Sequence, residues 1–221
     1  MTEETWSAVD EYIVGKLHDP DASLDAAIRA SDAAGLPSIQ VSAAQGKFLH
    51  ILVKAHGAKR ILEIGTLGGY STIWMARALP NDGRLITMEI EPAHAAVAKA
   101  NVERAGVADR VEILVGNALD LLPELEKREQ QPFDLCFIDA DKVSIPTYFE
   151  SALRMSRKGS LILVDNVVRK GAVIEENSED PSVQGVRRLN DMLSGDSRVT
   201  ATVLQTVGIK GYDGLAIAFV N

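Results

Sequence analysis

Two apolar runs in the sequence each end on side chains that carry oxygen ligands. In "LCFIDADK" (135–142) four apolar residues lead into Asp139, and in "LILVDN" (161–166) four more lead into Asp165 and Asn166. Two ionised carboxylates at partly buried strand ends lose hydration and repel each other unless a cation lies between them. Two carboxylates and an amide oxygen form a hard, all-oxygen set that favours Mg²⁺, Ca²⁺ or Mn²⁺ over softer metals. We therefore expect a divalent metal site; the alternative is that both aspartates cap the segments that follow them.

Lys142 follows the first of these aspartates by three positions. A free lysine titrates at about 10.4, and a neighbouring dication together with partial burial lowers that pKa toward a value useful for a general base. A divalent ion that holds two vicinal oxygens would also orient an acceptor and lower the pKa of its hydroxyl group. The pattern suits removal of a proton from a hydroxyl. The alternative is a surface lysine that opens a helix and forms a solvated pair with Asp141.

A glycine-containing turn follows an earlier apolar run, in "EIGTLGGYS" (63–71). Glycine allows a tight turn between strand and helix and a close approach to a ligand, and the helix N-terminus beyond it supplies amide donors. Glu89 ends the next expected strand, where a carboxylate would accept hydrogen bonds from a ribose diol. The spacing of Gly65, Gly68 and Gly69 differs from the G-x-G-x-x-G of dinucleotide sites, so a nucleoside without a diphosphate fits better. A turn that needs glycine for backbone reasons alone is the alternative.

A sheet must position these side chains, because continuous apolar runs alternate with helical patterns along the chain. This alternation predicts parallel strands covered by helices on both faces. The expected strands are 60–64, 84–89, 110–115, 135–138 and 160–165, and the helices between them are 70–79, 92–105, 118–128 and 143–156. Two β-rich runs, 198–207 and 214–220, have no helix between them and should pair antiparallel. The expected fold class is α/β, a doubly wound, mostly parallel seven-stranded sheet with a C-terminal antiparallel strand pair and N-terminal helices.

The N-terminal part of the chain has a different pattern. Apolar residues recur at helical spacing over 6–17, and Ser42 with Gln45 has the spacing of a capping box ahead of another helical run. We expect a single domain that spans all 221 residues. It comprises an N-terminal helical segment (1–58) and an α/β core (59–221) that binds the cofactor and the metal.

The composition is that of an ordinary globular protein, with 46% hydrophobic and 24% charged residues. The formal net charge of -8 argues against tight binding to nucleic acid phosphates. The single cysteine, Cys136, lies inside an apolar run, which indicates a buried, unreactive thiol. The chain starts without the basic and apolar regions of a secretory signal, and no run reaches the roughly 18 apolar residues of a membrane span. We expect a cytoplasmic protein that binds neither nucleic acid nor membranes.

Three motifs in this order, "ILEIGTLGGYS", "FIDADK" and "VDNV", resemble the metal-dependent class of S-adenosylmethionine O-methyltransferases. That class includes catechol and caffeoyl-coenzyme A methyltransferases, and its small bacterial members are the most similar. The resemblance covers nearly the entire chain, from "VSAAQGKFL" near the N-terminus to the final strand pair. It implies a Rossmann-like methyltransferase fold, S-adenosyl-L-methionine as methyl donor, usually Mg²⁺ as the metal, and a homodimer.

The resemblance also implies roles for individual residues. Lys142 corresponds to the catalytic base of the family, and Asp139, Asp165 and Asn166 correspond to its metal ligands. Glu89 would bind the ribose of the cofactor. The residues expected around the cofactor are Val41, Glu63, Gly65, Thr66, Gly69, Tyr70, Ser71, Glu89, Ala118 and Asp139.

The sequence departs from the family pattern at positions that concern the acceptor. Arg169 stands near a place where many members have tryptophan, and Ser144 and Ile145 replace a common Asn-Tyr pair. Asn117, beside the expected adenine site, replaces an acidic residue of many relatives. Arg169 and Lys170 would suit an anionic group. The expected substrate is therefore a small hydroxylated aromatic with vicinal hydroxyls, to which a carboxylate could be attached.

Three other functions stay open. Some relatives methylate a hydroxylated uridine of transfer RNA, although the acidic balance weighs against this substrate. A nicotinamide-dependent oxidoreductase would share the fold, but the glycine spacing and the pair of metal aspartates disfavour it. A non-catalytic binding module would have no need for the aspartates, the lysine and the asparagine together.

Overall fold

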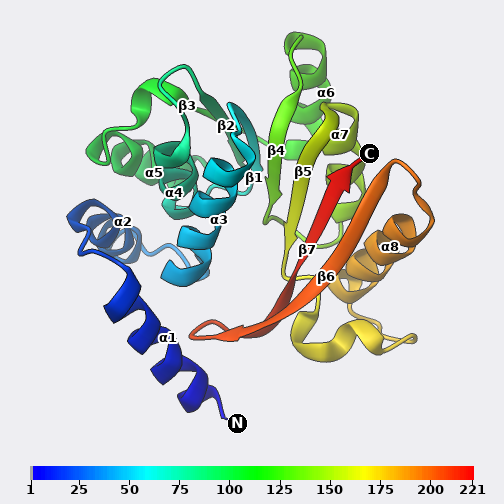
Figure 1. The fold of residues 1–221 in the computed structure, drawn as a ribbon, viewed down its shortest axis with the longest axis horizontal. Helices are drawn as coiled ribbons and strands as arrows, with labels where there is room; N and C mark the ends of the chain where they lie inside the picture. The colour runs from blue at the N-terminus through cyan, green and yellow to red at the C-terminus, as the bar shows by residue number, and fades with distance from the viewer. Residues whose placement is uncertain (1) are drawn as a thin grey trace. The chain divides into compact units, whose positions relative to one another are not determined.

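The computed structural model describes residues 2–221, in which helices and strands alternate along most of the chain (Figure 1). The helical elements are α1 (Glu3–Leu17), α2 (Ala22–Ala33), α3 (Ala43–His56), α4 (Tyr70–Ala78), α5 (Pro92–Arg104), the 3₁₀ turn η1 (Ala108–Arg110), α6 (Ala118–Arg128), α7 (Ile145–Arg154), the 3₁₀ segment η2 (Arg169–Ile174) and α8 (Pro181–Gly195). The strands are β1 (Arg60–Ile64), β2 (Arg84–Glu89), β3 (Val111–Val115), β4 (Phe133–Ile138), β5 (Ser156–Asp165), β6 (Val199–Gly208) and β7 (Gly211–Val220). Over residues 2–221, no helix combines the length and apolar character needed to cross a membrane.

The strands form a mixed seven-stranded sheet in the order β3-β2-β1-β4-β5-β7-β6. The pairs β1–β4, β2–β3 and β4–β5 are parallel, and β7 pairs antiparallel with β5. The predicted doubly wound sheet with an antiparallel C-terminal pair is therefore confirmed. The strand order reverses direction between β1 and β4, and open α/β sheets bind ligands beyond the carboxyl ends of strands at such a point.

Contacts along the chain divide it into two compact units. The first contains the described residues up to Lys59 together with Gly65–Asn117 and Gly208–Gly211, so it holds α1 to α5, β2, β3 and the β6–β7 turn. The second contains Arg60–Ile64, Ala118–Val207 and Tyr212–Asn221, so it holds β1, β4 to β7 and α6 to α8. The glycine turn belongs to the first unit, and the strands that end on aspartates belong to the second.

The first unit contains the helices α1, α2 and α3, in the segment that the sequence predicts to be helical. The Ser42 hydroxyl accepts a hydrogen bond from the Gln45 amide at 3.1 Å, which starts α3 at the predicted place. The β6–β7 turn packs on this unit, because the Ile209 amide donates to the Asp10 carboxylate at 2.8 Å. In the same turn, the Lys210 ammonium donates to the Ser38 carbonyl at 3.1 Å.

The central strand β4 of the second unit is shielded from solvent. Every residue of β4 is buried, and the side chains of 135–138 are completely inaccessible to solvent. Continuous apolar strands of this kind need cover on both faces. Helix α7 packs against β4 and β5 and also contacts α6 and α8 (Figure 1).

Strand β5 begins earlier than the predicted 160–165, at Ser156. The Ser160 hydroxyl donates to the Phe133 carbonyl at 2.7 Å and accepts from the Arg157 amide at 3.0 Å. Gly159 adopts a φ of 92°, which glycine tolerates. The strand therefore extends by four residues, 156–159, that the apolar pattern did not indicate.

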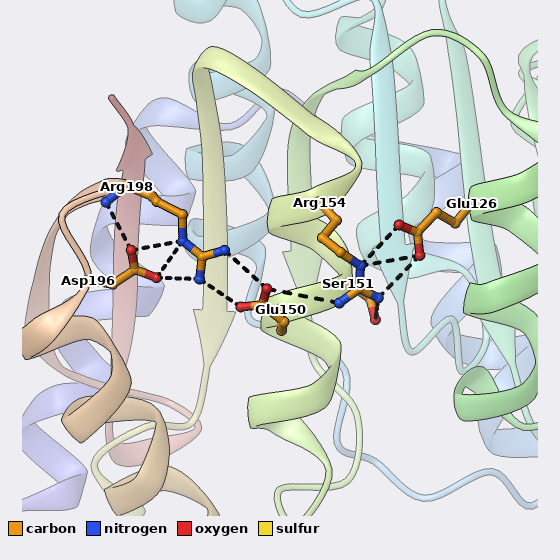
Figure 2. A network of polar contacts seen from close by, with 6 residues as sticks. All are labelled: Glu126, Glu150, Ser151, Arg154, Asp196 and Arg198. Atoms are coloured by element: carbon orange, nitrogen blue, oxygen red, sulfur yellow. Dashed lines mark hydrogen bonds and ion pairs between the residues drawn. The ribbon is translucent and has the colours of Figure 1, made fainter.

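A network of ion pairs joins three parts of the second unit at its surface (Figure 2). Arg154 of α7 pairs with Glu126 of α6 at 3.0 Å. Arg198, just before β6, pairs with Glu150 of α7 at 2.8 Å and with Asp196 at 2.6 Å. Exposed pairs of this kind usually contribute little to stability individually. We interpret the network as part of the scaffold around α7.

Candidate active site

The glycine turn of the first unit has a backbone that most residues avoid. Gly65 and Gly69 have φ values of 104° and 80°, and Leu67 between them has a φ of 49°. The Gly65 amide donates to the Met88 carbonyl at 3.0 Å, and the Gly69 amide donates to the Thr66 carbonyl at 2.8 Å. Left-handed backbone is strained for leucine and costs glycine nothing. The two hydrogen bonds hold this turn between the end of β1 and the start of α4.

The Glu89 carboxylate lies at the end of β2 and is tied to this turn. One oxygen accepts from the Leu67 amide at 2.7 Å, and the other accepts from the Glu91 amide at 3.0 Å. The residue is only 7% exposed. An ionised carboxylate has about four lone-pair sites, so two remain for hydroxyl donors. His94, whose Nδ1 lies 3.7 Å from the carboxylate, is a neighbour that the sequence did not indicate.

Several other residues expected around the cofactor also belong to the first unit. Tyr70 and Ser71 form the first turn of α4 and are buried, and Val41 is buried just before α3. Burial raises the pKa of the Tyr70 phenol, so this hydroxyl stays neutral. Thr66 and Thr87 share a buried hydrogen bond between their hydroxyls. The N-terminus of a helix is a general binding place for groups that accept hydrogen bonds, and here it follows the glycine turn directly.

The remaining expected cofactor residues are divided between the units. In the first unit, Gly116 follows β3 with a φ of 149°, and its amide donates to the Glu89 carbonyl at 2.8 Å. Asn117 beside it is exposed. In the second unit, Glu63 is completely buried in β1, and Ala118 is buried at the start of α6.

The register of the second unit aligns the ends of three strands. Ile64 of β1 pairs with Ile138 of β4, and Ile138 in turn pairs with Val164 of β5. Asp139 and Asp165 are therefore the next residues of adjacent parallel strands, which run about 4.8 Å apart. The Asp139 amide donates to the Ile64 carbonyl at 2.8 Å and continues the β1–β4 ladder by one step. The two aspartates occupy neighbouring positions on the same edge of the sheet, which we call the carboxylate edge.

Lys142 belongs to the carboxylate edge through its side chain. Its ammonium group lies 2.8 Å from the Asp139 carboxylate, and the two side chains are 10% and 22% exposed. The surface-lysine alternative is therefore wrong. A buried ammonium needs such a partner to offset its lost hydration.

Asp141 has a separate, structural role. Its carboxylate accepts from the Ser144 amide at 2.9 Å and from the Tyr148 hydroxyl, which fixes the start of α7. Burial alone would raise the pKa of Asp141, but these hydrogen bonds hold it below its ordinary value. The capping role that the sequence left open for Asp139 is thus performed by Asp141.

Asn166 adopts an unusual backbone directly after the second aspartate. Its φ is 59°, and its amide donates to the Asp165 carboxylate at 2.8 Å. Asparagine tolerates the left-handed region better than most residues. The Val167 amide donates to the Gly214 carbonyl of β7 at 3.1 Å. The chain therefore turns sharply at the end of β5 and is tied to β7 one residue later.

Asp213 holds the next part of this turn and was missed by the sequence analysis. One of its carboxylate oxygens accepts from the amides of Val168, Arg169 and Gly214 at 2.9, 3.0 and 2.9 Å. Arg169 and Lys170 both have a φ of 55°. Three charge-assisted hydrogen bonds stabilise a backbone that these residues do not prefer. In sequence, "GYDG" indicates only a turn, so its partner 45 residues away was not predictable.

The donors at the carboxylate edge fit a divalent cation. The register places Asp139 and Asp165 at adjacent strand ends, Asp165 is 5% exposed, and Asn166 follows it directly in the chain. A hard cation prefers this oxygen set and would offset the repulsion between the two carboxylates. Among residues 2–221, no three His, Cys, Asp or Glu side chains form a metal-binding cluster. A ligand set with only two carboxylates and one amide agrees with that result.

The cysteine and two of the histidines have structural surroundings. Cys136 is completely buried, and burial raises the pKa of its thiol to about 12, which confirms the expected unreactive thiol. His50 Nδ1 lies 3.0 Å from the Trp74 carbonyl and therefore carries a proton that it donates. The rings of His18 and His50 both contact the Trp74 ring edge-on. These histidines pack on the helices of the first unit.

The sequence is similar to that of known proteins. The sequence profile described as O-methyltransferase matches residues 19–218. The chain is 53% identical to a catechol O-methyltransferase from Niastella koreensis, with complete coverage of both chains. It is 51% identical to a catechol O-methyltransferase from Mycobacterium tuberculosis, over 96% of this chain and 95% of the other.

Solved structures are equally similar. An O-methyltransferase from Bacillus cereus in complex with SAH has a TM-score of 0.98 and 52% identity, with complete coverage of both chains. An O-methyltransferase from Streptomyces achromogenes, involved in tomaymycin synthesis and solved in complex with SAM, has a TM-score of 0.97 and 52% identity. That match covers 100% of this chain and 99% of the other.

Proposed function

Because the chain belongs to the O-methyltransferase family and is an S-adenosylmethionine-dependent enzyme, we propose that it methylates one hydroxyl of a vicinal dihydroxy aromatic in a divalent-metal-dependent reaction. Lys142 is the general base of this reaction. The observation that carries the proposal is the register of the second unit, which brings Asp139 and Asp165 to adjacent strand ends. The catechol O-methyltransferases among the relatives support the choice of acceptor.

Most of the residues that we assign to the methyl donor lie in the first unit. The two lone-pair sites left on the Glu89 carboxylate accept the ribose hydroxyls, and the amides at the start of α4 line the same turn. Both groups are fixed by bonds to the protein itself, so little ordering is needed when the donor binds. Positioning of donor and acceptor in line can contribute about 7–11 kcal/mol to a reaction of this kind.

The carboxylate edge holds the metal. Asp139, Asp165 and the amide oxygen of Asn166 are the ligands, and their hard oxygens favour Mg²⁺, with Ca²⁺ or Mn²⁺ as alternatives. A bound dication supplies positive charge that lowers the pKa of the acceptor hydroxyl. The protein's contribution is the fixed spacing of the ligands, which the strand register and the tie between Val167 and Gly214 maintain.

Lys142 accepts the proton that the acceptor loses. Its amine lies next to the Asp139 carboxylate, so it is held at the metal ligand itself. During transfer, the acceptor oxygen forms a bond to the methyl carbon while the bond from that carbon to the donor sulfur breaks. The sulfonium becomes a neutral thioether, and the hydroxyl proton moves to the lysine amine. Low exposure of Lys142 keeps water from competing for that proton.

Arg169 is the group that we propose for an anionic substituent of the acceptor. Its Nε is buried and has no hydrogen-bond partner among the described residues. Its backbone is fixed next to Asn166 by the Asp213 carboxylate. A buried donor without a partner favours a ligand that supplies an acceptor. A carboxylate on the aromatic ring would do so.

The direct test is radiolabelled methyl transfer from S-adenosylmethionine. We expect label on catechols with Mg²⁺ present, none after dialysis against a chelator, and recovery when Mg²⁺ is returned. Lys142→Ala should lower kcat by about 100-fold or more, in the range that general-base catalysis contributes. Its affinity for the donor should change little, because Lys142 is not among the residues that we expect around the donor.

Three results would contradict the proposal. Full activity in chelator would exclude the metal, and an unchanged kcat for Lys142→Ala would exclude this residue as the base. Label found only on bulk transfer RNA, assayed in parallel, would replace the acceptor class.

A further inference from the structure

Helix α8 packs directly on the backbone of the lysine that we assign as base. A Cβ atom added to Gly185 would lie 2.0 Å from the Lys142 carbonyl oxygen, 2.8 Å from its carbonyl carbon and 3.0 Å from the Val143 Cα. All three are backbone atoms, which cannot rotate away as the end of a flexible side chain would. Gly185 is also buried in the second unit. The absence of a side chain at this position therefore sets how closely α8 approaches Lys142.

The same helix makes a second contact with this segment one turn further on. The Arg188 guanidinium donates to the Val143 carbonyl at 3.3 Å. From the other side, Asp141 accepts from the Ser144 amide and the Tyr148 hydroxyl. The backbone on either side of Lys142 is thus held by α7 and by α8. The Lys142 side chain contacts Asp139.

From this packing we infer that Gly185 is a positioning residue for Lys142. The inference rests on the proposed function, in which Lys142 is the base. A methyl group at position 185 would force the Lys142 carbonyl and α8 apart by about 1 Å or more, because non-bonded carbon and oxygen atoms do not approach closer than normal contact. The ammonium group, now 2.8 Å from Asp139, would move with its backbone.

Glycine in the middle of a helix is unfavourable compared with alanine. α8 contains a second glycine, Gly195, at its C-terminal end, and a Cβ added there would meet nothing within 4 Å. The two positions therefore offer the same substitution on one helix, with and without a backbone clash. Gly195→Ala is the matched control for Gly185→Ala.

The experiment measures kcat, KM for a catechol acceptor, affinity for S-adenosylmethionine by calorimetry, and Tm. For Gly185→Ala we expect kcat to fall by about 100-fold, which is the typical result of a 1 Å misplacement. The affinity for the donor should stay within about twofold of the parent protein, because neither Gly185 nor Lys142 is among the residues that we expect around the donor. Gly195→Ala should match the parent protein in every measurement except a slightly higher Tm.

Two further measurements distinguish a displaced Lys142 from a general loss of structure in Gly185→Ala. In a Lys142→Ala background, Gly185→Ala should cause no additional loss of kcat, because the group through which it acts is already absent. A crystal structure of Gly185→Ala should show the lysine amine more than 3.5 Å from Asp139, beyond hydrogen-bond range. An additional loss in that background, or an unchanged lysine position, would overturn the inference.

Arg188→Gln provides a milder variant in case Gly185→Ala does not fold. Loss of its hydrogen bond to the Val143 carbonyl should lower kcat by about threefold with no change in donor affinity. An unchanged kcat would then overturn the inference. If Lys142→Ala itself keeps full activity, the base assignment fails; if Lys142→Ala is slow while Gly185→Ala is fast, only the role of Gly185 fails.

Discussion

The glycine turn of the first unit and the carboxylate edge of the second hold their acidic groups by different means. Both oxygens of Glu89 are bound by backbone amides, from Leu67 and Glu91. Asp139 is bound by the ammonium group of Lys142. A backbone amide is a permanent donor, whereas an ammonium group can lose a proton and its charge. The first region is therefore suited to hold a ligand, and the second is suited to exchange a proton.

This difference agrees with how each region is supported. The glycine turn is closed by hydrogen bonds within itself, to the end of β2 and to α5, where the Asn101 side-chain amide donates to the Gly68 carbonyl at 2.9 Å. The carboxylate edge depends on distant segments, since β7 holds the turn after Asn166 through Asp213 and α8 holds the Lys142 backbone. Long-range packing should make the second region the more sensitive to remote substitutions.

Asp165→Asn should give the largest effect and would sharpen the comparison most. The substitution removes one of two metal carboxylates and leaves the first unit unchanged. Because partners that only support metal ligands contribute about 10–100-fold, loss of a ligand should lower kcat by about 1000-fold. Calorimetry should show weaker Mg²⁺ binding and unchanged donor binding.

The control for that prediction is Asp191→Asn, an exposed aspartate of α8 with the same change of charge. It should behave like the parent protein in both binding measurements. Equal losses in the two variants would mean that net charge, rather than ligand geometry, governs Mg²⁺ binding.

Glu89→Gln should have a smaller effect than Asp165→Asn, and it should weaken binding of the donor rather than of the metal. One of its two oxygens becomes an NH₂ group that faces a backbone amide and cannot accept its hydrogen bond, and the charge that assists both bonds is lost. Affinity for S-adenosylmethionine should fall about 10–100-fold, as expected for loss of a charged hydrogen bond. Mg²⁺ binding should be unaffected.

Glu91→Gln is the control here, because Glu91 is exposed and contributes only its backbone amide to Glu89. Donor affinity should remain at the parent level. If Glu89→Gln weakened Mg²⁺ binding as strongly as donor binding, the two regions would not be independent and the comparison would fail.

The smallest effect concerns pH and the helices of the first unit. Burial lowers the pKa of His50 below its ordinary value, and the charges of Lys54, Lys47 and Arg77 add to this effect against the hydrogen bond to Trp74, which raises it. The unfolded chain therefore binds a proton first as the pH falls below about 6.5, and stability is lost from there downward. Tm should fall between about pH 7.5 and pH 5.5 by a few degrees more in the parent protein than in His50→Gln. Equal slopes for the two proteins would contradict this role of His50.

Much of the fold was predictable from the sequence because its signals are local. Continuous apolar runs gave the parallel strands, and the absence of a helix between the last two runs gave the antiparallel pair. The start of β5 was not predictable, since it depends on hydrogen bonds between Ser160, Phe133 and Arg157. The bond from Ser160 to Phe133 joins residues 27 positions apart, which a local pattern does not specify.

The candidate site divides in the same way. The types and order of Asp139, Lys142, Asp165 and Asn166 were readable as oxygen ligands and a base. Their alignment at one edge follows from the β4–β5 register, which no local pattern specifies. The role of Asp213 had no sequence signal beyond a turn.

The sequence by itself determined which chemical groups are present and that they stand at the ends of buried strands, because burial and periodicity are local properties of a chain. Only the tertiary structure decided which groups meet: Lys142 with Asp139 instead of Asp141, and Gly185 against the Lys142 carbonyl. Contacts of this kind depend on how closely two backbones approach. That distance is fixed by the packing of the whole unit rather than by any segment of it.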